Sequence, residues 1–266
     1  MFYGTGVTYV KLPYECTTIG FSAFEECSNL TSIKQYTDSI DDWVEGVEPT
    51  TGPLSRVTSF GDNCFRNCRL LSLTNDDISG ATSIGENAFQ GTLLSGTLNL
   101  PNLTGILRKN AFANTQISSV SSLGSITEIE NTVFGNTNIS SITIPNSVKK
   151  CSCNFVDNTP VPEIIFPEGV EEIYDGQFYT KNNSLTYIEI PSTVTNMGFF
   201  FHRSLENSQD NLCTVVIKAI TPPTLNYFAS WAADWTRGDK FSGIYVPDAS
   251  LTVYQSAAGA WQHSSI

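Results

Sequence analysis

The chain has 266 residues, with 14 lysines and arginines against 26 aspartates and glutamates, and a formal net charge of −12. This acidic excess argues against binding to nucleic-acid phosphates or to anionic lipid, both of which attract basic surfaces. The sequence contains no long apolar run that would span a membrane and no basic-then-apolar signal peptide at its start. We therefore expect no nucleic-acid partner and no membrane insertion.

A short apolar pattern recurs nine times along the chain. Each copy reads apolar-x-x-apolar-x-apolar, often closed by proline, as in Val7-Val10-Leu12-Pro13. A phenylalanine follows each strand-like pattern, and successive phenylalanines lie 41, 24, 23, 22, 21, 23 and 23 residues apart. These phenylalanines are Phe24, Phe65, Phe89, Phe112, Phe134, Phe155, Phe178 and Phe201. A period of about 20–29 residues with an L-x-x-L-x-L core is typical of leucine-rich repeats.

Residues 139–160 illustrate the unit that this pattern predicts. Ile142 and Ile144 alternate inward as in a strand, and Pro145 ends the strand because it has no N–H to donate. Val148 and Phe155 are expected to cover the other side of the core. One unit alone cannot bury its apolar face, so the units must stack. We predict an α/β repeat solenoid of the leucine-rich-repeat type, right-handed and mostly β and irregular, with a parallel sheet along one face.

Three segments depart from the repeat. An insertion near residues 35–53 explains the spacing of 41, and residues 199–211 break the pattern a second time. The tail, residues 218–266, is rich in tryptophan and contains one more strand-like piece before a short predicted helix. Because terminal repeats must close an open core, we predict repeats over 1–217 and a C-terminal capping segment of the same solenoid over 218–266.

The cysteines occupy positions that other copies fill with small residues. Cys27 and Cys68 each lie three residues after the repeat phenylalanine, where other copies have Thr92, Thr115, Thr137 and Asn158. Cys16 stands where others have valine, Cys64 where others have alanine, and Cys151 where others have isoleucine. We expect these thiols to be buried and unbridged, as free cysteine often is, although a Cys27–Cys68 disulfide is not sterically excluded.

No catalytic or metal-binding motif is found. The two histidines, His202 and His263, lie outside any such motif, and zinc sites require paired cysteines or histidines at set spacing. The adjacent carboxylates Glu171-Glu172 and Asp76-Asp77 are expected to point to opposite faces, as solvated surface residues. We predict no catalytic residue, no metal site and no cofactor.

Two groups of residues are candidates for binding. The first consists of the outward strand positions, of which Tyr9, Ser119, Ser141 and Tyr187 are the main candidates; alternation leaves these side chains outside the core. The second is Asp41, Asp42 and Trp43 in the acidic insertion, which could bind a cation or a basic partner. The alternatives are that the outward positions only keep the surface solvated and soluble, and that the insertion is only a surface loop on the first repeats with no binding role.

Several strings resemble the BspA-like leucine-rich repeats of Bacteroides-type surface proteins. They are IGFSAFEECSNLTSI (19–33), FGDNCFRNCRLLSL (60–73), IGENAFQG (84–91) and ITIPNSV (142–148), and the tail is similar to the closing segment of such proteins. The resemblance covers about residues 7–261 and departs at 35–53 and 199–211. It implies a secreted or cell-surface protein, associated with adhesion and without known catalytic residues.

We therefore predict a non-catalytic recognition and adhesion module at the cell surface or outside the cell, binding a protein or a glycan. Two alternatives stay open: a glycan-acting enzyme built on a repeat scaffold, which opposed acids in a cleft would favour, and a purely structural spacer.

Overall fold

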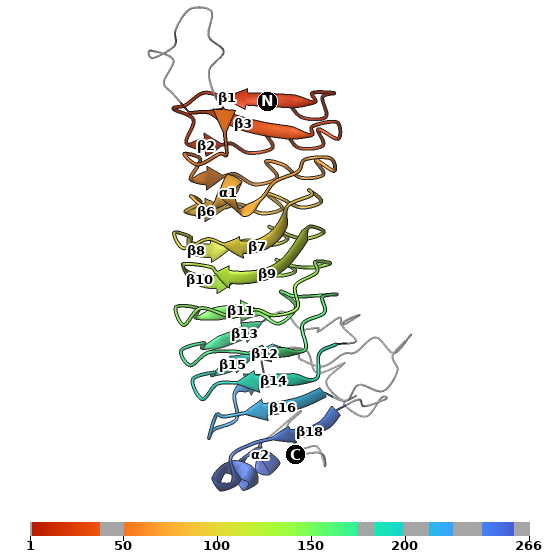
Figure 1. The fold of residues 1–266 in the computed structure, drawn as a ribbon. Helices are drawn as coiled ribbons and strands as arrows, with labels where there is room; N and C mark the ends of the chain where they lie inside the picture. The colour runs from red at the N-terminus through yellow and green to blue at the C-terminus, as the bar shows by residue number, and fades with distance from the viewer. Residues whose placement is uncertain (1, 38–50, 175–183, 199–212, 226–240, 258–266) are drawn as a thin grey trace, which may run out of the picture.

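The chain folds into an elongated stack of similar turns, each laid against the one before it (Figure 1). The computed structural model describes residues 2–37, 51–174, 184–198, 213–225 and 241–257. Most turns contribute two short strands, and strands at the same position in successive turns pair in parallel. The predicted leucine-rich-repeat solenoid, mostly β and irregular, is confirmed.

The first strand of each turn forms what we call the first-strand row. Its members pair within three sheets, β1-β3, β7-β9 and β12-β14-β16-β18. Residues 71–74 and 139–144 carry the same apolar pattern but have no strand, so this row is divided. The strands are β1 (Tyr9–Leu12), β3 (Ser32–Tyr36), β7 (Ser95–Asn99), β9 (Gln116–Ser122), β12 (Glu163–Ile165), β14 (Tyr187–Ile190), β16 (Cys213–Ile217) and β18 (Phe241–Tyr245).

The structure also has a second row of strands, which we call the second-strand row. These strands were not predicted as a separate sheet in the sequence analysis. The second-strand row pairs in the orders β2-β5-β6 and β8-β10-β11-β13-β15-β17. Its register sets Cys151 between Ile129 and Ile173, which confirms the isoleucine-like position of that cysteine. The strands are β2 (Thr18–Ile19), β5 (Ser59–Phe60), β6 (Ser83–Ile84), β8 (Thr104–Leu107), β10 (Ser125–Ile129), β11 (Lys150–Ser152), β13 (Glu172–Tyr174), β15 (Asn196–Met197) and β17 (Thr224–Leu225).

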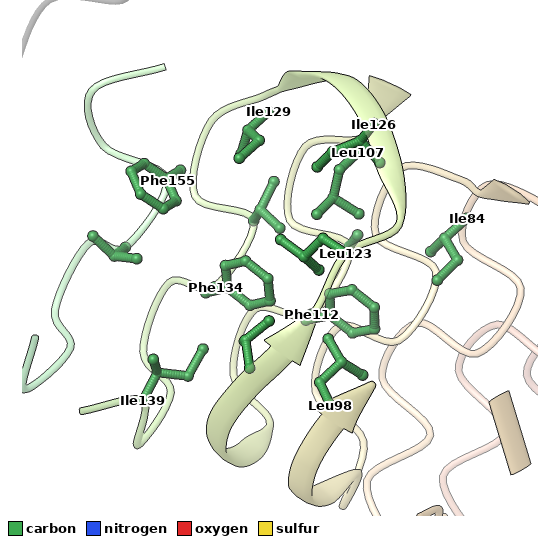
Figure 2. Packing of buried hydrophobic residues seen from close by; sticks show 14 of the residues in the cluster. Ile84, Leu98, Leu107, Phe112, Leu123, Ile126, Ile129, Phe134, Ile139 and Phe155 are labelled. Carbon is green, nitrogen blue, oxygen red and sulfur yellow. The ribbon is translucent and has the colours of Figure 1, made fainter. Parts of the chain in front are cut away.

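The repeat phenylalanines form a stacked spine through the core, of which Figure 2 shows the middle part. Consecutive rings from Phe2 to Phe134 are stacked, with centroids 5.4–5.8 Å apart and interplanar angles of 3–29°. The rings of Phe65, Phe89, Phe112 and Phe134 are completely buried. The spine begins at Phe2, one ring earlier than the sequence pattern indicated. Phe178 and Phe201 lie outside the described residues.

One position of the predicted spine is shifted by a residue. Phe134 N–H donates to the carbonyl of Phe155, just as Phe112 N–H donates to the carbonyl of Val133. Phe155 therefore takes the place of Val133, and Val156 takes the place of Phe134. The alignment of Phe155 with the spine was wrong, although Phe155 is buried as expected. Because Phe155 and Val156 are both apolar, the repeat period alone could not show which of them continues the spine.

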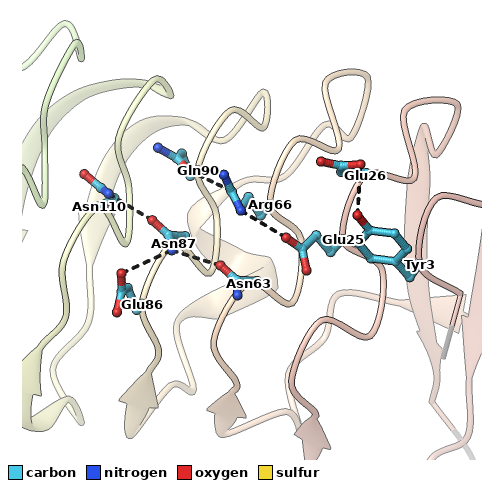
Figure 3. A network of polar contacts seen from close by, with 9 residues as sticks. All are labelled: Tyr3, Glu25, Glu26, Asn63, Arg66, Glu86, Asn87, Gln90 and Asn110. Carbon is cyan, nitrogen blue, oxygen red and sulfur yellow. Dashed lines mark hydrogen bonds and ion pairs between the residues drawn. The ribbon is translucent and has the colours of Figure 1, made fainter.

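Residues with left-handed backbone, most of them asparagines, flank the spine residues and shape the turn there. Asn63 and Asn67 have φ of 57° and 60°, and Asn110 and Asn114 have φ of 54° and 57°. Asparagine enters this region more readily than most residues. The side chains also bond along the stack, as Figure 3 shows: Asn87 donates to Asn63 and Asn110 donates to Asn87, both at 2.9 Å.

The side chain three residues after each spine residue forms a hydrogen bond to the backbone, in most cases within its own turn. The hydroxyls of Thr92, Thr115 and Thr137 each donate to the carbonyl of the phenylalanine three residues earlier, at 2.7–2.9 Å. Thr159 does the same to Val156 at 2.7 Å, so Thr159 and not Asn158 fills this position. The thiols of Cys27 and Cys68 instead donate to the spine carbonyl of the preceding turn.

All seven cysteines are free thiols. Cys27, Cys64, Cys68 and Cys151 are buried as predicted, whereas Cys16, which was also predicted to be buried, is only half-buried. Burial raises the pKa of Cys68 to about 12, and burial also raises the pKa values of Cys64 and Cys151 well above the ordinary value.

The insertion leaves the solenoid through a short hairpin. β3 pairs antiparallel with β4 (Thr51–Gly52), which sets Gln35 opposite Gly52 and Tyr36 opposite Thr51. Gln35 is buried, and its amide donates to the carbonyls of Pro13, Tyr14 and Cys16 at 2.7–3.1 Å. The base of the insertion is thus tied to the first turn.

Helical structure within the described ranges is brief. A single turn, α1 (Asn75–Ile78), lies between the first-strand segment 71–74 and β6. After β18 the chain forms a 3-10 turn (Asp248–Ser250) and α2 (Leu251–Ser256), which confirms the short helix predicted for the tail. Tyr254 of α2 is buried, and its hydroxyl donates to the carbonyl of Ala219 at 2.9 Å. The boundary between the repeats (1–217) and the C-terminal capping segment (218–266) stays a prediction.

Removing a spine ring should leave a cavity between two turns. We expect Phe112→Ala or Phe134→Ala to lower the free energy of unfolding by about 3–5 kcal/mol, the usual cost for a buried phenylalanine. Chemical denaturation measures this loss, with the exposed Leu70 as control, since Leu70→Ala removes no core contact. A loss below about 1 kcal/mol for both phenylalanine variants would contradict the role of the spine.

The thiols should differ sharply in reactivity. Only the thiolate reacts, so raised pKa values and burial should protect Cys64, Cys68 and Cys151 from a maleimide between about pH 7 and pH 9, while half-buried Cys16 labels first. Peptide mapping of pulse-labelled protein measures the order. Finding two or more native disulfides after alkylation under denaturing, non-reducing conditions would refute the free-thiol assignment.

The insertion should be dispensable for the fold because its base already closes a hairpin. Replacing residues 38–50 with Asn-Gly leaves a three-residue loop after Tyr36, a length that hairpins commonly use. We expect the denaturation midpoint to change little. Changing Gln35 to alanine is the contrasting control, because it removes a buried side-chain amide that donates to three carbonyls of the first turn, and it should destabilise by about 1–3 kcal/mol. A larger loss from the loop replacement than from the Gln35 variant would be inconsistent with this reading.

Candidate binding surface

The structure places the predicted outward positions in register along the first-strand row. Tyr9 lies beside Ser32, Thr97 beside Ser119, and Tyr187 between Glu163 and Thr214. Tyr9 is exposed, Ser119 is half-buried with its hydroxyl 2.7 Å from that of Thr97, and Tyr187 is half-buried. Ser141 is exposed but lies in the segment without a strand. Asp41, Asp42 and Trp43 lie outside the described residues.

These positions do not converge on one site. Tyr9 belongs to β1 at one end of the stack and Tyr187 to β14 near the other, with β9 between them (Figure 1). A ligand of ordinary size would meet one part of the row only. The chemically most varied part is the outward side of the sheet β12-β14-β16-β18, which we call the C-terminal sheet face.

Two rows of outward side chains cross the C-terminal sheet face. Glu163, Tyr187 and Thr214 form one row, and Ile165, Glu189, Val216 and Tyr245 form the other, as the strand register dictates. Ile165 and Tyr245 are 48% and 57% exposed, which is high for large apolar side chains. Apolar groups therefore flank a polar centre.

The polar centre is held in place by hydrogen bonds. Tyr187 donates its hydroxyl to Glu189 Oε2 at 3.0 Å, and Lys218 Nζ lies 2.6 Å from Glu189 Oε1. The hydrogen bond from Lys218 lowers the pKa of Glu189, and the same bond raises the pKa of Lys218. Burial, followed by the bond to Glu189, raises the pKa of Tyr187. At neutral pH the centre is thus a fixed carboxylate between an ammonium and a neutral phenol.

A second group of charges lies on the second-strand row. Tyr174 donates its hydroxyl to Glu128 Oε1 at 2.6 Å, and Lys150 forms an ion pair with Glu172 at 2.9 Å. Burial, and then the bond to Glu128, raises the pKa of Tyr174 well above its ordinary value, so this phenol stays protonated and does not act as a base near neutrality. Within this group, Tyr174 is therefore paired with Glu128, and Lys150 with Glu172.

The adjacent carboxylates fall into two cases. Glu171 and Glu172 pair with Lys149 and Lys150 at 3.6 and 2.9 Å, on the surface as expected. The prediction that Asp77 is a solvated surface residue was wrong: it is 3% exposed. Its Oδ2 accepts from the backbone and hydroxyl of Thr74, and its Oδ1 lies 3.4 Å from Lys34 Nζ. Asp77 therefore caps α1 and has a structural role.

A third group of polar side chains joins the first turns to one another. It was not predicted in the sequence analysis. Arg66 lies between Glu25 and Gln90, with nitrogen–oxygen distances of 3.2 Å to each (Figure 3). These residues come from three successive turns. The available signal was the recurrence of charged or amide residues one position after the spine, at Glu25, Arg66 and Gln90.

Neither metal binding nor membrane crossing is indicated where the structure is described. No group of three or more histidine, cysteine, aspartate or glutamate side chains in those ranges is placed to hold a metal ion. In the same ranges, no helix has the length and apolar character needed to cross a bilayer.

Comparison with known proteins places this geometry in a family. The model of the BspA type leucine rich repeat region matches in six copies, over residues 1–44, 50–155 and 82–209. A search of curated proteins finds no significant match.

One solved structure is similar in fold, and a second matches at a lower score. One, a leucine-rich repeat protein from Bacteroides ovatus, is 20% identical with a TM-score of 0.54; the match covers 91% of this chain and 61% of that protein. The other, a leucine rich cell surface protein from Faecalibacterium prausnitzii, is 12% identical with a TM-score of 0.38, and the match covers 95% and 83% of the two chains. With the family model matching most of its length, and with the solenoid that such repeats build, the chain belongs to the BspA type leucine-rich repeat family.

Proposed function

We propose that the chain is a non-catalytic recognition and adhesion module of a secreted or cell-surface protein, and that it binds a protein or glycan ligand. The observation that carries this proposal is the C-terminal sheet face, where a fixed polar centre is flanked by exposed Ile165 and Tyr245. Solenoids use such extended faces for binding. An extracellular location is part of the proposal and is motivated by the resemblance to bacterial surface repeats.

The chemistry of this face suits recognition better than turnover. Glu189 is bound on both oxygens, so it is poorly available as a general base or a nucleophile. The same bonds hold Tyr187 and Lys218 in one arrangement, which lowers the entropy lost when a ligand orders the surface. Tyrosine and isoleucine side chains supply the apolar contact, and Glu163, exposed on the neighbouring row, supplies an acceptor for a ligand donor.

A screen against extracellular matrix proteins and immobilised glycans provides the ligand for the test. We expect Tyr187→Ala and Tyr245→Ala each to weaken binding by about tenfold, equivalent to about 1.4 kcal/mol, with little effect on unfolding. Tyr187→Phe separates the ring from its hydroxyl. Tyr9→Ala, Ser119→Ala and Ser141→Ala test the rest of the row in the same assay.

The matched control is Leu70→Ala, an exposed apolar change outside the C-terminal sheet face. If all first-strand variants bind the ligand as the parent does, the binding surface lies elsewhere, and the loop replacement at 38–50 becomes the next variant to assay. Turnover of a glycan or peptide by the purified protein would refute the non-catalytic assignment.

A further inference from the structure

Only one of the two interruptions in the first-strand row is bridged on both sides. Residues 71–74 have no strand, yet Ser72 N–H donates to the carbonyl of Thr31 at 3.3 Å, and the carbonyl of Leu71 accepts from Leu93 N–H at 2.9 Å. The backbone of this segment is therefore tied to the turn before it and to the turn after it.

Residues 139–144, the other interruption, are tied only to the turn before them. The N–H of Asn138 donates to the carbonyl of Ile117 at 3.0 Å, and that of Ser140 donates to the carbonyl of Ser118 at 3.4 Å. On the other side, no backbone hydrogen bond joins residues 139–144 to residues 160–166, all of which the structure describes. The first-strand row is thus parted between these two turns.

Two prolines account for the missing bonds. Pro160 and Pro162 lie one turn after Asn138 and Ser140, at the positions whose N–H groups would continue the same two bonds. Proline has no N–H to donate, and within sheets it is found mainly on edge strands. Pairing resumes in the following turn, where Thr186 N–H donates to the carbonyl of Pro162 at 2.8 Å.

Side-chain packing is also weaker in the turn of residues 139–160. Ile142 points inward by its place in the repeat but is only half-buried, while the equivalent Val120 and Ile164 of the neighbouring turns are 9% and 1% exposed. Among the described residues, the run of stacked rings ends at Phe134, because Val156 takes the next place in the spine. The core therefore holds this turn less tightly than the turns before it.

The second-strand row continues through the same two turns (Figure 1). Lys149 N–H donates to the carbonyl of Thr127 at 2.8 Å, and Glu171 N–H donates to the carbonyl of Lys149 at 2.9 Å, so that β10, β11 and β13 are joined in succession. The ion pair between Lys150 and Glu172 spans β11 and β13 at 2.9 Å. The two turns are therefore joined on one side of the stack and parted on the other.

We propose that the solenoid has a hinge at this place. Its first-strand side opens between residues 139–144 and β12, while β11 and β13 hold the two parts of the stack together. Hinges of this kind are a few loop or element-terminal residues that absorb the change in backbone angles. The motion changes the angle between the outward side of the sheet β7-β9 and the C-terminal sheet face, whatever ligand either surface binds.

Thiol labelling at buried positions measures the opening. Ile164 of β12 and Ile188 of β14 are each 1% exposed and lie side by side in the register, and Ile173 of β13 is completely buried. Local opening exposes a buried side chain without unfolding the whole chain, so we expect Ile164→Cys to react with a maleimide about tenfold faster than Ile188→Cys and Ile173→Cys in the native protein. Peptide mapping separates the introduced thiol from the seven native ones.

Replacing both prolines tests the cause of the opening. Pro160→Asn combined with Pro162→Ser places the residues of the preceding turn at both positions, and the two N–H groups can then donate across the break. We expect this double change to slow the labelling of Ile164→Cys toward the rate of Ile188→Cys.

Equal labelling of Ile164→Cys and Ile188→Cys overturns the hinge, and so does a rate that the proline replacement leaves unchanged. Labelling of Ile173→Cys as fast as that of Ile164→Cys shows that the turns separate on both sides, which also excludes a hinge. Thermal unfolding checks that each variant is folded. If Ile164→Cys does not fold, Ile144→Cys on the other side of the break takes its place and is compared with Ile190→Cys, these isoleucines being 4% and 0% exposed.

Discussion

The structure depends on one constraint: no turn can bury its own apolar side chains. A turn contributes about two short strands and one spine residue, and the atoms that cover these come from the turns before and after it. Rings spaced 5.4–5.8 Å apart and strands in parallel register are two expressions of the same stacking. Stability is then close to a sum over nearest neighbours, so local damage is felt mainly by the adjoining turns.

Polar residues obey the same constraint. Where a turn must reverse around the spine, asparagines adopt the left-handed backbone and bond to the equivalent asparagine of the next turn. Where a small side chain must fit after the spine, threonine returns its hydroxyl to the backbone, and cysteine replaces it with a bond to the preceding turn. The repeat therefore selects residues for the backbone geometry as well as for the core.

The repeat period made the solenoid, the spine and the small-residue positions predictable from sequence. The second row of strands was not, because most of its strands have only two or three residues, which is too short to show alternation. The shift from Phe155 to Val156 was not, because two apolar neighbours fit the period equally well. Asp77 was misassigned because alternation along a strand was assumed, whereas Thr74 begins a helical turn that turns the carboxylate inward. On the binding surface, outward positions could be predicted, but the bond between Glu189 and Lys218 joins residues 29 apart and depends on how two turns align.

The direction of the bonds between turns has a mechanical consequence. Parallel strands lie across the long axis of the stack, so the hydrogen bonds that join them run along it. A pulling force applied at the two ends of the stack loads these bonds along their own direction and concentrates on the outermost intact turn. The turns then peel away one after another instead of rupturing together. A solenoid pulled in this way lengthens gradually, and each released turn adds chain length while the remaining stack keeps its fold.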